Sequence, residues 1–398
     1  MGHDNPEPES SAEKLDQVLP DSLDRRTFVA GAISASVAGL AGCAGGGGSA
    51  GGSAGGTPSG DVMSRDIVWR ADWTVAVNNV VTIMAEHEGF LEEYGASITK
   101  AERGFGSADT TRRIGTAQDN ERLGKANFVA VMNGIDAGQN VSIIGTDRPR
   151  SALGLIYEEG SIDDPTSYSG LDIAVAPSLR ASYPLYEVAT GMGGPDNLAN
   201  NLQTVEESAH PASLENGEID ASWHTTDTFA DYDAQTDIDL VFEPLYAHFP
   251  IVEDVLITNT DWLQEEDNLE FVSRCLTAHS HCAKYIMLNP EEAVDILRED
   301  LNPDLQLTER DVLLTGMRTG LLSLALRDEV KNQGYNFLSE DVLTTSMENV
   351  AEANGLEVPA YEDVAATEVQ EQADLATYTD EEWSQIQEYT GEWTDLLE

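Results

Sequence analysis

The sequence predicts an α/β protein of two lobes, each a parallel β-sheet with helices on both faces. From residue 66 onward, short apolar runs alternate with segments of helical periodicity, which is typical of parallel strands joined by helices. The alternation stops at a polar stretch and restarts at residue 171, which indicates a second lobe. Hydrophobic residues make up 41% of the 398 positions, enough for sizeable cores.

The elements follow in order along the chain. For the first lobe we expect strands over residues 67–73, 96–103, 125–132 and 141–147, and helices over 79–95 and 111–118. For the second we expect strands over residues 171–176, 202–205, 219–225 and 239–245, and helices over 182–191 and 211–217. A further strand is expected over 252–260. From residue 267 the chain is mostly helical, with breaks at Pro290, Pro303, Gly334 and Pro359.

The two cysteines of the folded part lie in one of these helical segments. Cys275 and Cys282 are two helical turns apart, about 10.5 Å of rise, which is too far for a disulfide within one helix. We expect two buried thiols and no metal site.

The first 60 residues have the pattern of an export signal and a tether. Arg25 and Arg26 precede a weakly apolar run over 29–41, as in twin-arginine signals, and the run is too short for a spanning helix. Leu40-Ala41-Gly42-Cys43 is similar to a lipobox, which predicts a lipid anchor on Cys43. The Gly/Ser-rich segment after it predicts a flexible tether.

The charge of the chain is strongly acidic. Lys and Arg total 21 and Asp and Glu total 72, so the formal net charge is -51. A carboxylate-rich surface on a folded core is typical of proteins from salt-loving organisms, in which concentrated salt screens the repulsion. The charge excludes electrostatic binding to nucleic acid or to an anionic membrane.

Several short motifs occur in a fixed order. They are Asp72-Trp73, the segment Ala85–Gly95, the turn Gly104–Ser107, Ala126-Asn127-Phe128, the passage Ser161–Val175, Leu214–Ala221 and Asn289–Ala293. Together they resemble the substrate-binding proteins of ABC importers for nitrate, sulfonates, taurine and thiamine-pyrimidine precursors. Asp72-Trp73 and Leu256–Trp262 are most similar to the thiamine-pyrimidine branch, although Val75–Asn78 replaces its Pro-Asn.

The resemblance implies a periplasmic-binding-protein fold of the type II-like kind, with the lobes joined by a double-crossing hinge. We expect the crossings near Tyr157–Pro165 and Glu243–Pro250. The chain then divides into a signal over 1–42, a tether over 43–65, a first part of lobe 1 over 66–157, lobe 2 over 158–250, and a second part of lobe 1 with C-terminal helices over 251–398. We expect a monomer without a cofactor, partnered by a small solute and by an ABC permease and its ATPase.

Candidate ligand-binding residues lie at strand ends and helix starts. They are Trp73, Asn78, Asn79, Ser107, Asn127, Ser178, Arg180, Ser182, Tyr183 and Trp223. Trp73 is either a stacking wall or a core residue, and Trp223 faces either the cleft or the core. Asn127 can equally be structural. Few cations lie near strand ends, with Arg103 and Arg180 foremost, so we favour a neutral or zwitterionic heteroaromatic solute over nitrate or a sulfonate.

No recognised catalytic motif occurs in the folded part, so we expect a binding protein and not an enzyme. The alternatives from other classes are a secreted enzyme related to thiamine-pyrimidine synthases and a sensory or structural surface lipoprotein.

Overall fold

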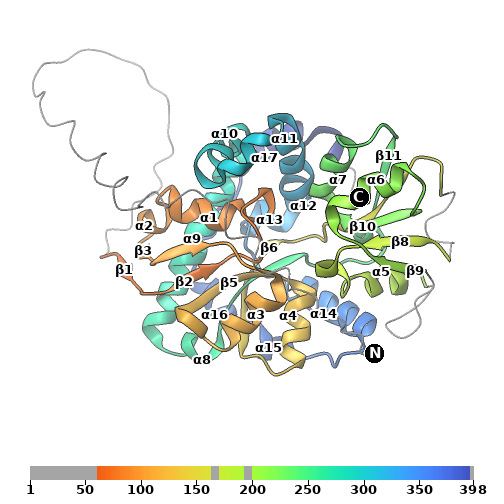
Figure 1. Ribbon diagram of the computed structural model, residues 1–398. Coiled ribbons are helices and arrows are strands. Elements are labelled where there is room, and N and C mark those ends of the chain that lie inside the picture. The colour runs from red at the N-terminus through yellow and green to blue at the C-terminus, as the bar shows by residue number, and fades with distance from the viewer. Residues whose placement is uncertain (1–60, 163–169, 192–199, 395–398) are drawn as a thin grey trace, which may run out of the picture. The chain divides into compact units, whose positions relative to one another are not determined.

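The computed structural model describes residues 61–162, 170–191 and 200–394 (Figure 1). The predicted signal with Arg25, Arg26 and Cys43 lies outside the described residues, as does the tether up to residue 60. The strands form two five-stranded sheets and a two-stranded one. We call lobe 1 the sheet of order β4-β2-β5-β12-β6 with the helices packed on it, and lobe 2 the sheet of order β11-β7-β10-β8-β9 with its helices. Two α/β sheets are the predicted fold class, which is confirmed.

The sheet of lobe 1 brings five strand ends to one edge. Its strands are β2 (Val68–Arg70), β4 (Lys100–Glu102), β5 (Glu121–Asn127), β6 (Val141–Arg148) and β12 (Asp254–Asn259). β2 is parallel to β4 and β5, whereas β12 is antiparallel to β5 and β6. The carboxyl ends of β2, β4, β5 and β6 and the amino end of β12 therefore share an edge. β6 is buried at every position because helices cover both of its faces.

The helices of lobe 1 pack on both faces of this sheet. They include α1 (Val80–His87), α2 (Phe90–Glu93), α3 (Ser107–Gly115), α4 (Phe128–Asp136), α8 (Thr260–Leu263) and α9 (Glu266–Leu288). The expected strand 125–132 is wrong in its second half, because Asn127 ends β5 and caps α4 by accepting a hydrogen bond from the Val129 N–H. Cys275 and Cys282 in α9 are free and buried, as predicted.

Lobe 2 is formed by one continuous stretch of chain. Its strands are β7 (Leu153–Glu158), β8 (Asp172–Val175), β9 (Asn201–Thr204), β10 (Ala221–Thr225) and β11 (Leu240–Pro244). Its helices are α5 (Tyr183–Ala189), α6 (His210–Glu215) and α7 (Thr226–Asp233). β7 is antiparallel to both β10 and β11. The amino end of β7 thus lies at the same edge as the carboxyl ends of β8 and β10.

Two links join the lobes, and the first lies earlier than the sequence predicted. The chain leaves lobe 1 after β6 and enters lobe 2 at β7, so the first link is 149–152 and not Tyr157–Pro165. The prediction failed because Leu153–Tyr157 is a buried strand of lobe 2 that we did not recognise. The second link runs over 245–253, between β11 and β12.

The expected tether also ends earlier than predicted. Met63–Ser64 forms β1, which pairs with β3 (Ala96–Ser97) in the two-stranded sheet. The Arg65 side chain donates a hydrogen bond to Asn268. Residues 61–65 therefore belong to lobe 1.

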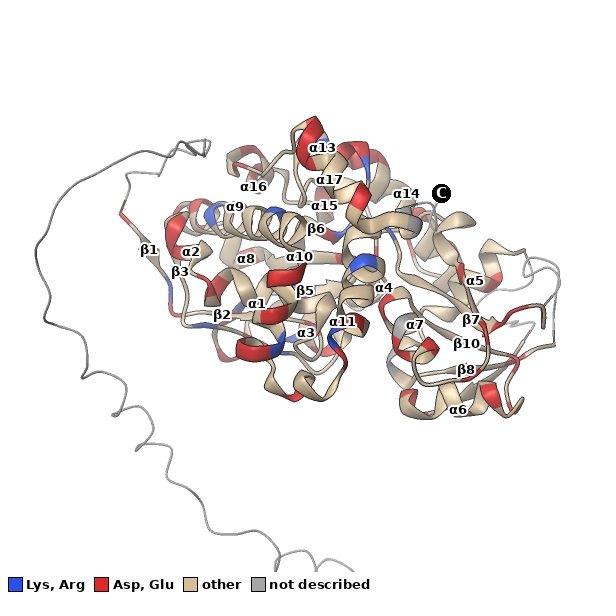
Figure 2. Ribbon diagram, turned by 90° about the horizontal axis from the view of Figure 1, so that it is seen from above, with Lys and Arg blue, Asp and Glu red and all other residues tan. Residues whose placement is uncertain are grey.

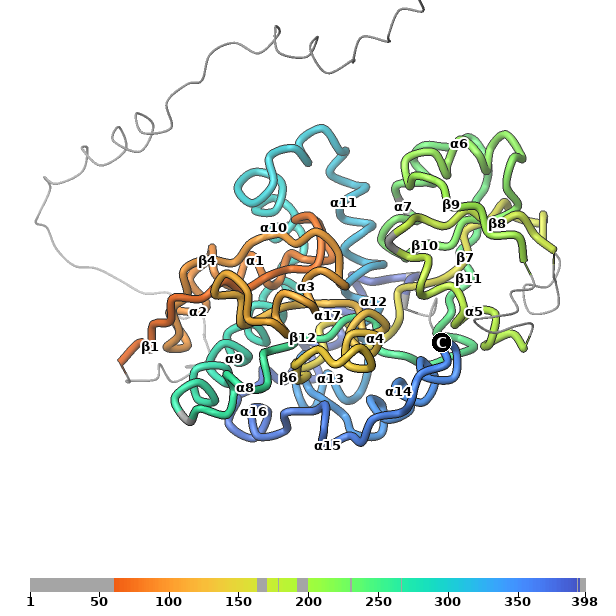
Figure 3. The backbone as a smooth tube through the Cα atoms, turned by 60° about the horizontal axis from the view of Figure 1, so that its bottom comes forward, coloured from red at the N-terminus to blue at the C-terminus, as the bar shows by residue number. Residues whose placement is uncertain are grey.

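The C-terminal helices contact both lobes. They are α10 (Pro290–Ile296), α11 (Arg310–Met317), α12 (Ser323–Ala325), α13 (Asp328–Gln333), α14 (Glu340–Asn354), α15 (Tyr361–Val364), α16 (Thr367–Gln372) and α17 (Asp380–Thr390), with π-helical turns η7 (Leu297–Leu301) and η9 (Arg318–Leu322). α14 packs on α4 of lobe 1 and on α5 of lobe 2 (Figure 3). α11 packs on α7, and Trp393 stacks edge-on against Phe229. The C-terminal helices therefore brace lobe 2 as well as lobe 1.

Acidic residues are distributed over most of the elements, whereas Lys and Arg are sparse (Figure 2). Within the described ranges, none of the helices is long and apolar enough to cross a membrane.

Candidate functional site

The candidate site lies where the strand ends of the two sheets meet the two links. The carboxyl ends of β2, β5 and β6 and the amino end of β12 carry the polar side chains of lobe 1, and the end of β10 carries those of lobe 2. Ligands of open α/β sheets bind at this edge. The first link joins the carboxyl end of β6 to the amino end of β7, and the second joins the carboxyl end of β11 to the amino end of β12. Residues from the two lobes therefore come together at this edge.

The glycine-rich turn packs directly on the end of β2. The Gly106 N–H donates to the Asp72 carbonyl at 2.7 Å, and the Gly104 N–H donates to the Trp73 carbonyl at 3.0 Å. A Cβ on Gly104 would lie 2.2 Å from the Ala71 carbonyl oxygen, so only glycine fits. This close approach explains Gly104, and a φ of 123° explains Gly106, the second glycine of the turn.

Ser107 and Trp73 flank this turn. The Ser107 hydroxyl donates to Asp72 Oδ2 at 3.0 Å and accepts from the Asn127 N–H at 2.9 Å. Trp73 is 44% exposed, and the nearest atom that a Cβ on Gly106 would meet is its ring, at 3.9 Å. Of the two interpretations of Trp73, its exposure favours a wall open to solvent over a core residue.

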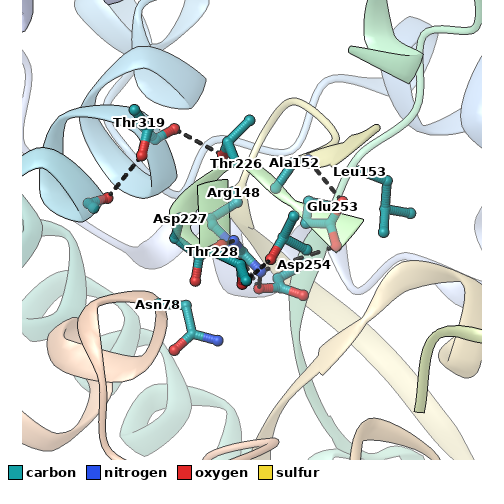
Figure 4. Close-up of polar contacts among 12 residues, drawn as sticks. Asn78, Arg148, Ala152, Leu153, Thr226, Asp227, Thr228, Glu253, Asp254 and Thr319 are labelled. Atoms are coloured by element: carbon teal, nitrogen blue, oxygen red, sulfur yellow. Dashed lines mark hydrogen bonds and ion pairs between the residues drawn. The ribbon is translucent and has the colours of Figure 1, made fainter. Parts of the chain in front are cut away.

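The two asparagines that start the next helix differ. Asn79 is buried, where its amide donates to the Thr74 carbonyl and its Oδ1 accepts from Lys125 at 3.1 Å. Asn78 is half-buried, and its side chain has no hydrogen-bond partner among the described residues; Figure 4 draws it without a dashed line. Asn79 therefore has a structural role, while Asn78 remains available to a ligand.

Lys125, which sequence reasoning missed, lies at the centre of the lobe 1 edge. It is fully buried on β5, and its Nζ lies 2.8 Å from Asp254, 3.5 Å from Asp147 and 3.7 Å from Asp72. Burial lowers the pKa of Lys125, but the three carboxylates outweigh that effect and raise it above its usual value. Burial raises the pKa of Asp147 to about 6.

Arg148 continues this charge network toward lobe 2. Its Nε and Nη2 both lie 2.7 Å from Asp254 Oδ2, and its Nη1 lies 3.8 Å from Asp227 Oδ1 of lobe 2 (Figure 4). Burial opposes the charge of Asp254, yet Arg148 and Lys125 hold the pKa of Asp254 below its usual value. Arg148 therefore contacts carboxylates of both lobes.

Glu253 holds the links and the start of α4 together. Its Oε2 accepts hydrogen bonds from the Ser151 hydroxyl and the Ala152 N–H, each at 2.8 Å, and its Oε1 accepts from the Asn127 amide at 2.8 Å. Burial raises the pKa of Glu253 to about 7. Asn127 thus serves both as the cap of α4 and as a partner of the second link.

Lobe 2 meets the C-terminal helices at the start of α7. The Thr226 hydroxyl donates to the Thr319 carbonyl in the π-helical turn η9 at 3.0 Å. A Cβ on Gly316 would lie 3.7 Å from the Asp227 carbonyl oxygen and 3.8 Å from the Val77 side chain. Asp227 and the segment that carries Asn78 therefore both approach α11 at Gly316.

Two of the residues expected to line the pocket belong to the core instead. Trp223 is fully buried in lobe 2, with its indole N–H donating to Ser182 Oγ at 3.0 Å. Tyr183 is also fully buried and stacks edge-on against Trp223 at 5.5 Å. Helices cover both faces of the lobe 2 sheet, so an aromatic residue on β10 packs inward on either face. This corrects the expectation that Trp223 and Tyr183 line a pocket.

The other candidate residues of lobe 2 differ in their exposure to solvent. Ser182 is buried, and its hydroxyl donates to the Leu179 carbonyl. Arg180 is exposed. The side chain of Ser178 lies outside the described residues. Of the two whose side chains the structure describes, Arg180 is the one open to solvent.

A family model described as "NMT1/THI5 like" matches residues 77–293, more than half of the chain. The chain belongs to the NMT1/THI5 like family. In this NMT1/THI5 like protein the matched residues run from the segment with Asn78 through lobe 2 to α10, and they include Lys125, Arg148, Asp227 and Glu253. Asp72 and Trp73 precede the match. No curated protein sequence matches the chain.

Several solved structures have the same fold. The ligand-binding component of an ABC-type import system from Staphylococcus aureus, with zinc bound, aligns at a TM-score of 0.57 and 11% identity over 78% of this chain and 100% of that chain. The periplasmic aliphatic sulphonate-binding protein SsuA from Escherichia coli gives a TM-score of 0.54 and 12% identity over 79% and 94%. The alkanesulfonate-binding protein SsuA from Xanthomonas axonopodis pv. citri, bound to MOPS, gives 0.53 and 12% over 78% and 99%. The NMT1/THI5 like chain thus has the periplasmic-binding-protein fold.

Proposed function

We propose that this protein is the extracellular solute-binding component of an ABC importer, which captures a small organic solute between its lobes and delivers it to a membrane permease and its ATPase. The observation that carries the proposal is the meeting of polar strand ends from two sheets at a pair of links. Two lobes joined in this way can close around a solute and signal its presence by closing. Family membership and the solved structures of the same fold support this function.

For the solute, we favour a heteroaromatic compound of the thiamine-precursor kind. An exposed Trp73 offers a ring face and Asn78 offers an amide. Nitrate, a sulfonate or taurine is the alternative, since two of the similar structures are sulfonate-binding proteins. The carboxylates around Lys125 and Arg148 weigh against an anion.

For the location, we propose export through the twin-arginine signal at Arg25 and Arg26 and lipid attachment at Cys43, on the outer face of the cytoplasmic membrane. A tether raises the local concentration of the protein near its permease. The net charge of -51 supports an origin in a salt-loving archaeon and a monomeric protein kept soluble by its carboxylates.

A thermal-shift screen in molar salt tests the proposal. The purified protein, without its signal, is heated with nitrate, taurine, alkylsulfonates, aminopyrimidines and a metabolite panel. We expect at least one compound to raise the melting temperature, because a ligand bound only by the folded state stabilises it. Recovery of that compound unchanged, by mass spectrometry, separates a binding protein from an enzyme. A chemically altered hit contradicts the proposal, and a panel without any hit favours the structural or sensory alternative.

A further inference from the structure

We infer that the solute is an organic cation whose positive charge is received by Asp72 of lobe 1 and Asp227 of lobe 2. The inference rests on the proposed function and goes beyond it by fixing the sign of the charge that the site accepts.

The first observation is a chain of alternating charges that ends on a carboxylate in each lobe. It runs from Asp72 to Lys125 (3.7 Å), to Asp254 (2.8 Å), to Arg148 (2.7 Å) and to Asp227 (3.8 Å). The three inner groups are almost fully buried. Each inner group has two or more oppositely charged neighbours, whereas each terminal carboxylate has a single cation within 4 Å among the described residues.

The second observation is that these terminal carboxylates have oxygens without a hydrogen-bond donor. Asp72 is only 8% exposed, and its Oδ1 has no hydrogen-bond partner within the part of the chain that the structure describes; the same holds for Asp227 Oδ1. A buried acceptor without a donor is costly. A ligand that supplies N–H donors removes that cost.

The third observation is the balance of charge around the network. Five carboxylates, Asp72, Asp147, Asp227, Glu253 and Asp254, surround two cations, Lys125 and Arg148. A bound anion would add to this excess, whereas a cation reduces it.

The arginines that could instead attract an anion do not reverse this balance. Arg148 Nη1 has no hydrogen-bond partner among the described residues, but Asp227 lies 3.8 Å from it, so an anion there would meet the carboxylate. Arg150 lies over the Tyr246 ring in the second link at 5.2 Å. Arg103 lies over the exposed Phe105 ring at 5.6 Å, and Arg180 is exposed.

Trp73 adds the preference for an organic cation. It follows Asp72 directly, is 44% exposed and lies beside Gly106. The face of an indole ring attracts a cation, and tryptophan does so more strongly than other aromatic residues. A carboxylate next to an open indole suits a planar amidinium or a protonated amine on an apolar group.

Three compounds of one shape and different charge test the inference. Benzamidine is a cation, benzamide is its neutral counterpart and benzenesulfonate is an anion on the same ring. In titrations of the intact protein in molar salt, followed by tryptophan fluorescence and calorimetry, we expect benzamidine to bind at least about tenfold more tightly than benzamide. We expect benzenesulfonate to bind more weakly than either.

Matched variants assign the effect to the site. Asp227→Asn should remove most of the preference for benzamidine over benzamide, while Asp233→Asn, on the exposed side of the same helix α7, should leave it unchanged. Asp72→Asn provides a second variant from the other lobe. Equal binding of benzamidine and benzamide, or no binding of benzamidine, overturns the inference. Tighter binding of benzenesulfonate also overturns it, while leaving the proposed solute-binding function intact.

Discussion

Glu253 in the second link accepts a hydrogen bond from Ser151 in the first link, with 2.8 Å between Oε2 and Oγ. The same oxygen accepts from the Ala152 N–H, and the other oxygen accepts from Asn127. One buried carboxylate therefore fixes the spacing of the two links and ties both to the start of α4.

Replacing this carboxylate should destabilise the protein. Glu253→Gln places an amide NH₂ where Ser151 and Ala152 need an acceptor, and a buried donor left unpaired costs about 1–3 kcal/mol. Chemical denaturation in molar salt measures the loss, with Glu159→Gln, at the exposed residue that follows β7, as the control. A variant as stable as the control contradicts the role of Glu253.

The same variant has a predicted pH dependence. Burial raises the pKa of Glu253 from its usual 4.5 to about 7. The folded protein therefore holds this proton more tightly than the unfolded chain, and the stabilisation is complete below pH 4.5 and lost as the pH rises through 7. The stability difference between the wild type and Glu253→Gln should shrink from about pH 5 to about pH 8. Parallel pH profiles would falsify this assignment.

Lys125 should be essential for folding. Lys125→Met leaves Asp254, Asp147 and Asp72 without their shared cation, and removing one partner of a buried ion pair costs about 3–5 kcal/mol. Lys100→Met, which changes a half-exposed lysine on β4, an edge strand of the same sheet, should cost less than about 1 kcal/mol. Similar melting temperatures for the two variants would show that the network does not stabilise the fold.

The two tryptophans should behave oppositely. Trp73→Ala should weaken binding of the compounds that shift the melting temperature, while changing the free energy of unfolding by no more than about 0.5 kcal/mol. Trp223→Ala removes a fully buried ring and should cost about 3–5 kcal/mol of stability. Calorimetric titration and denaturation of both variants check this. Unchanged binding in Trp73→Ala would remove Trp73 from the site.

Low salt should unfold the protein. With a net charge of -51, the carboxylates repel one another once the screening length grows from about 3 Å at molar salt to about 30 Å at low salt. We expect the folded circular dichroism signal to be lost on dialysis and regained when salt is restored. A melting temperature independent of salt contradicts this prediction.

Cys43 should hold the protein at the membrane. Cys43→Ser leaves no residue for lipid attachment, and we expect the protein to move from the membrane fraction into the medium. Arg25→Lys with Arg26→Lys, which alters the signal instead, should retain the precursor inside the cell. A Cys43→Ser protein that still sediments with membranes rules out the anchor.

The strand and helix pattern could be predicted because it is local. Asp72, Ser107 and Asn127 follow or end strands of the same sheet, and the rule that strand ends carry ligands places them together. Trp223 could not be placed, because both faces of its sheet are covered by helices and the alternation of a strand does not say which face lines a site. β7 was missed, because its pairing partners lie in β10 and β11, far along the chain.

The charge network could not be recognised for a different reason. In a chain with 72 acidic residues, Asp254 and Glu253 carry no distinguishing signal of their own. A signal did exist in Lys125, one of very few lysines and the only charged residue of the segment 123–132. A charged lysine between apolar residues of a central strand is buried, and a buried charge requires a carboxylate nearby. Lys125 therefore predicts carboxylates on the neighbouring strands.

The order of the strands determines when each lobe can be completed during synthesis. All five strands of lobe 2 lie between residues 153 and 244, so its sheet can close as soon as that stretch has left the ribosome. In lobe 1, β12 separates β5 from β6, and it follows the whole of lobe 2 in the chain. The β5 and β6 edges therefore wait, unpaired, until residue 259 is made. We expect lobe 2 to fold first, although its synthesis starts after that of lobe 1. The sheet of lobe 1 is then completed when β12 pairs with β5 and β6.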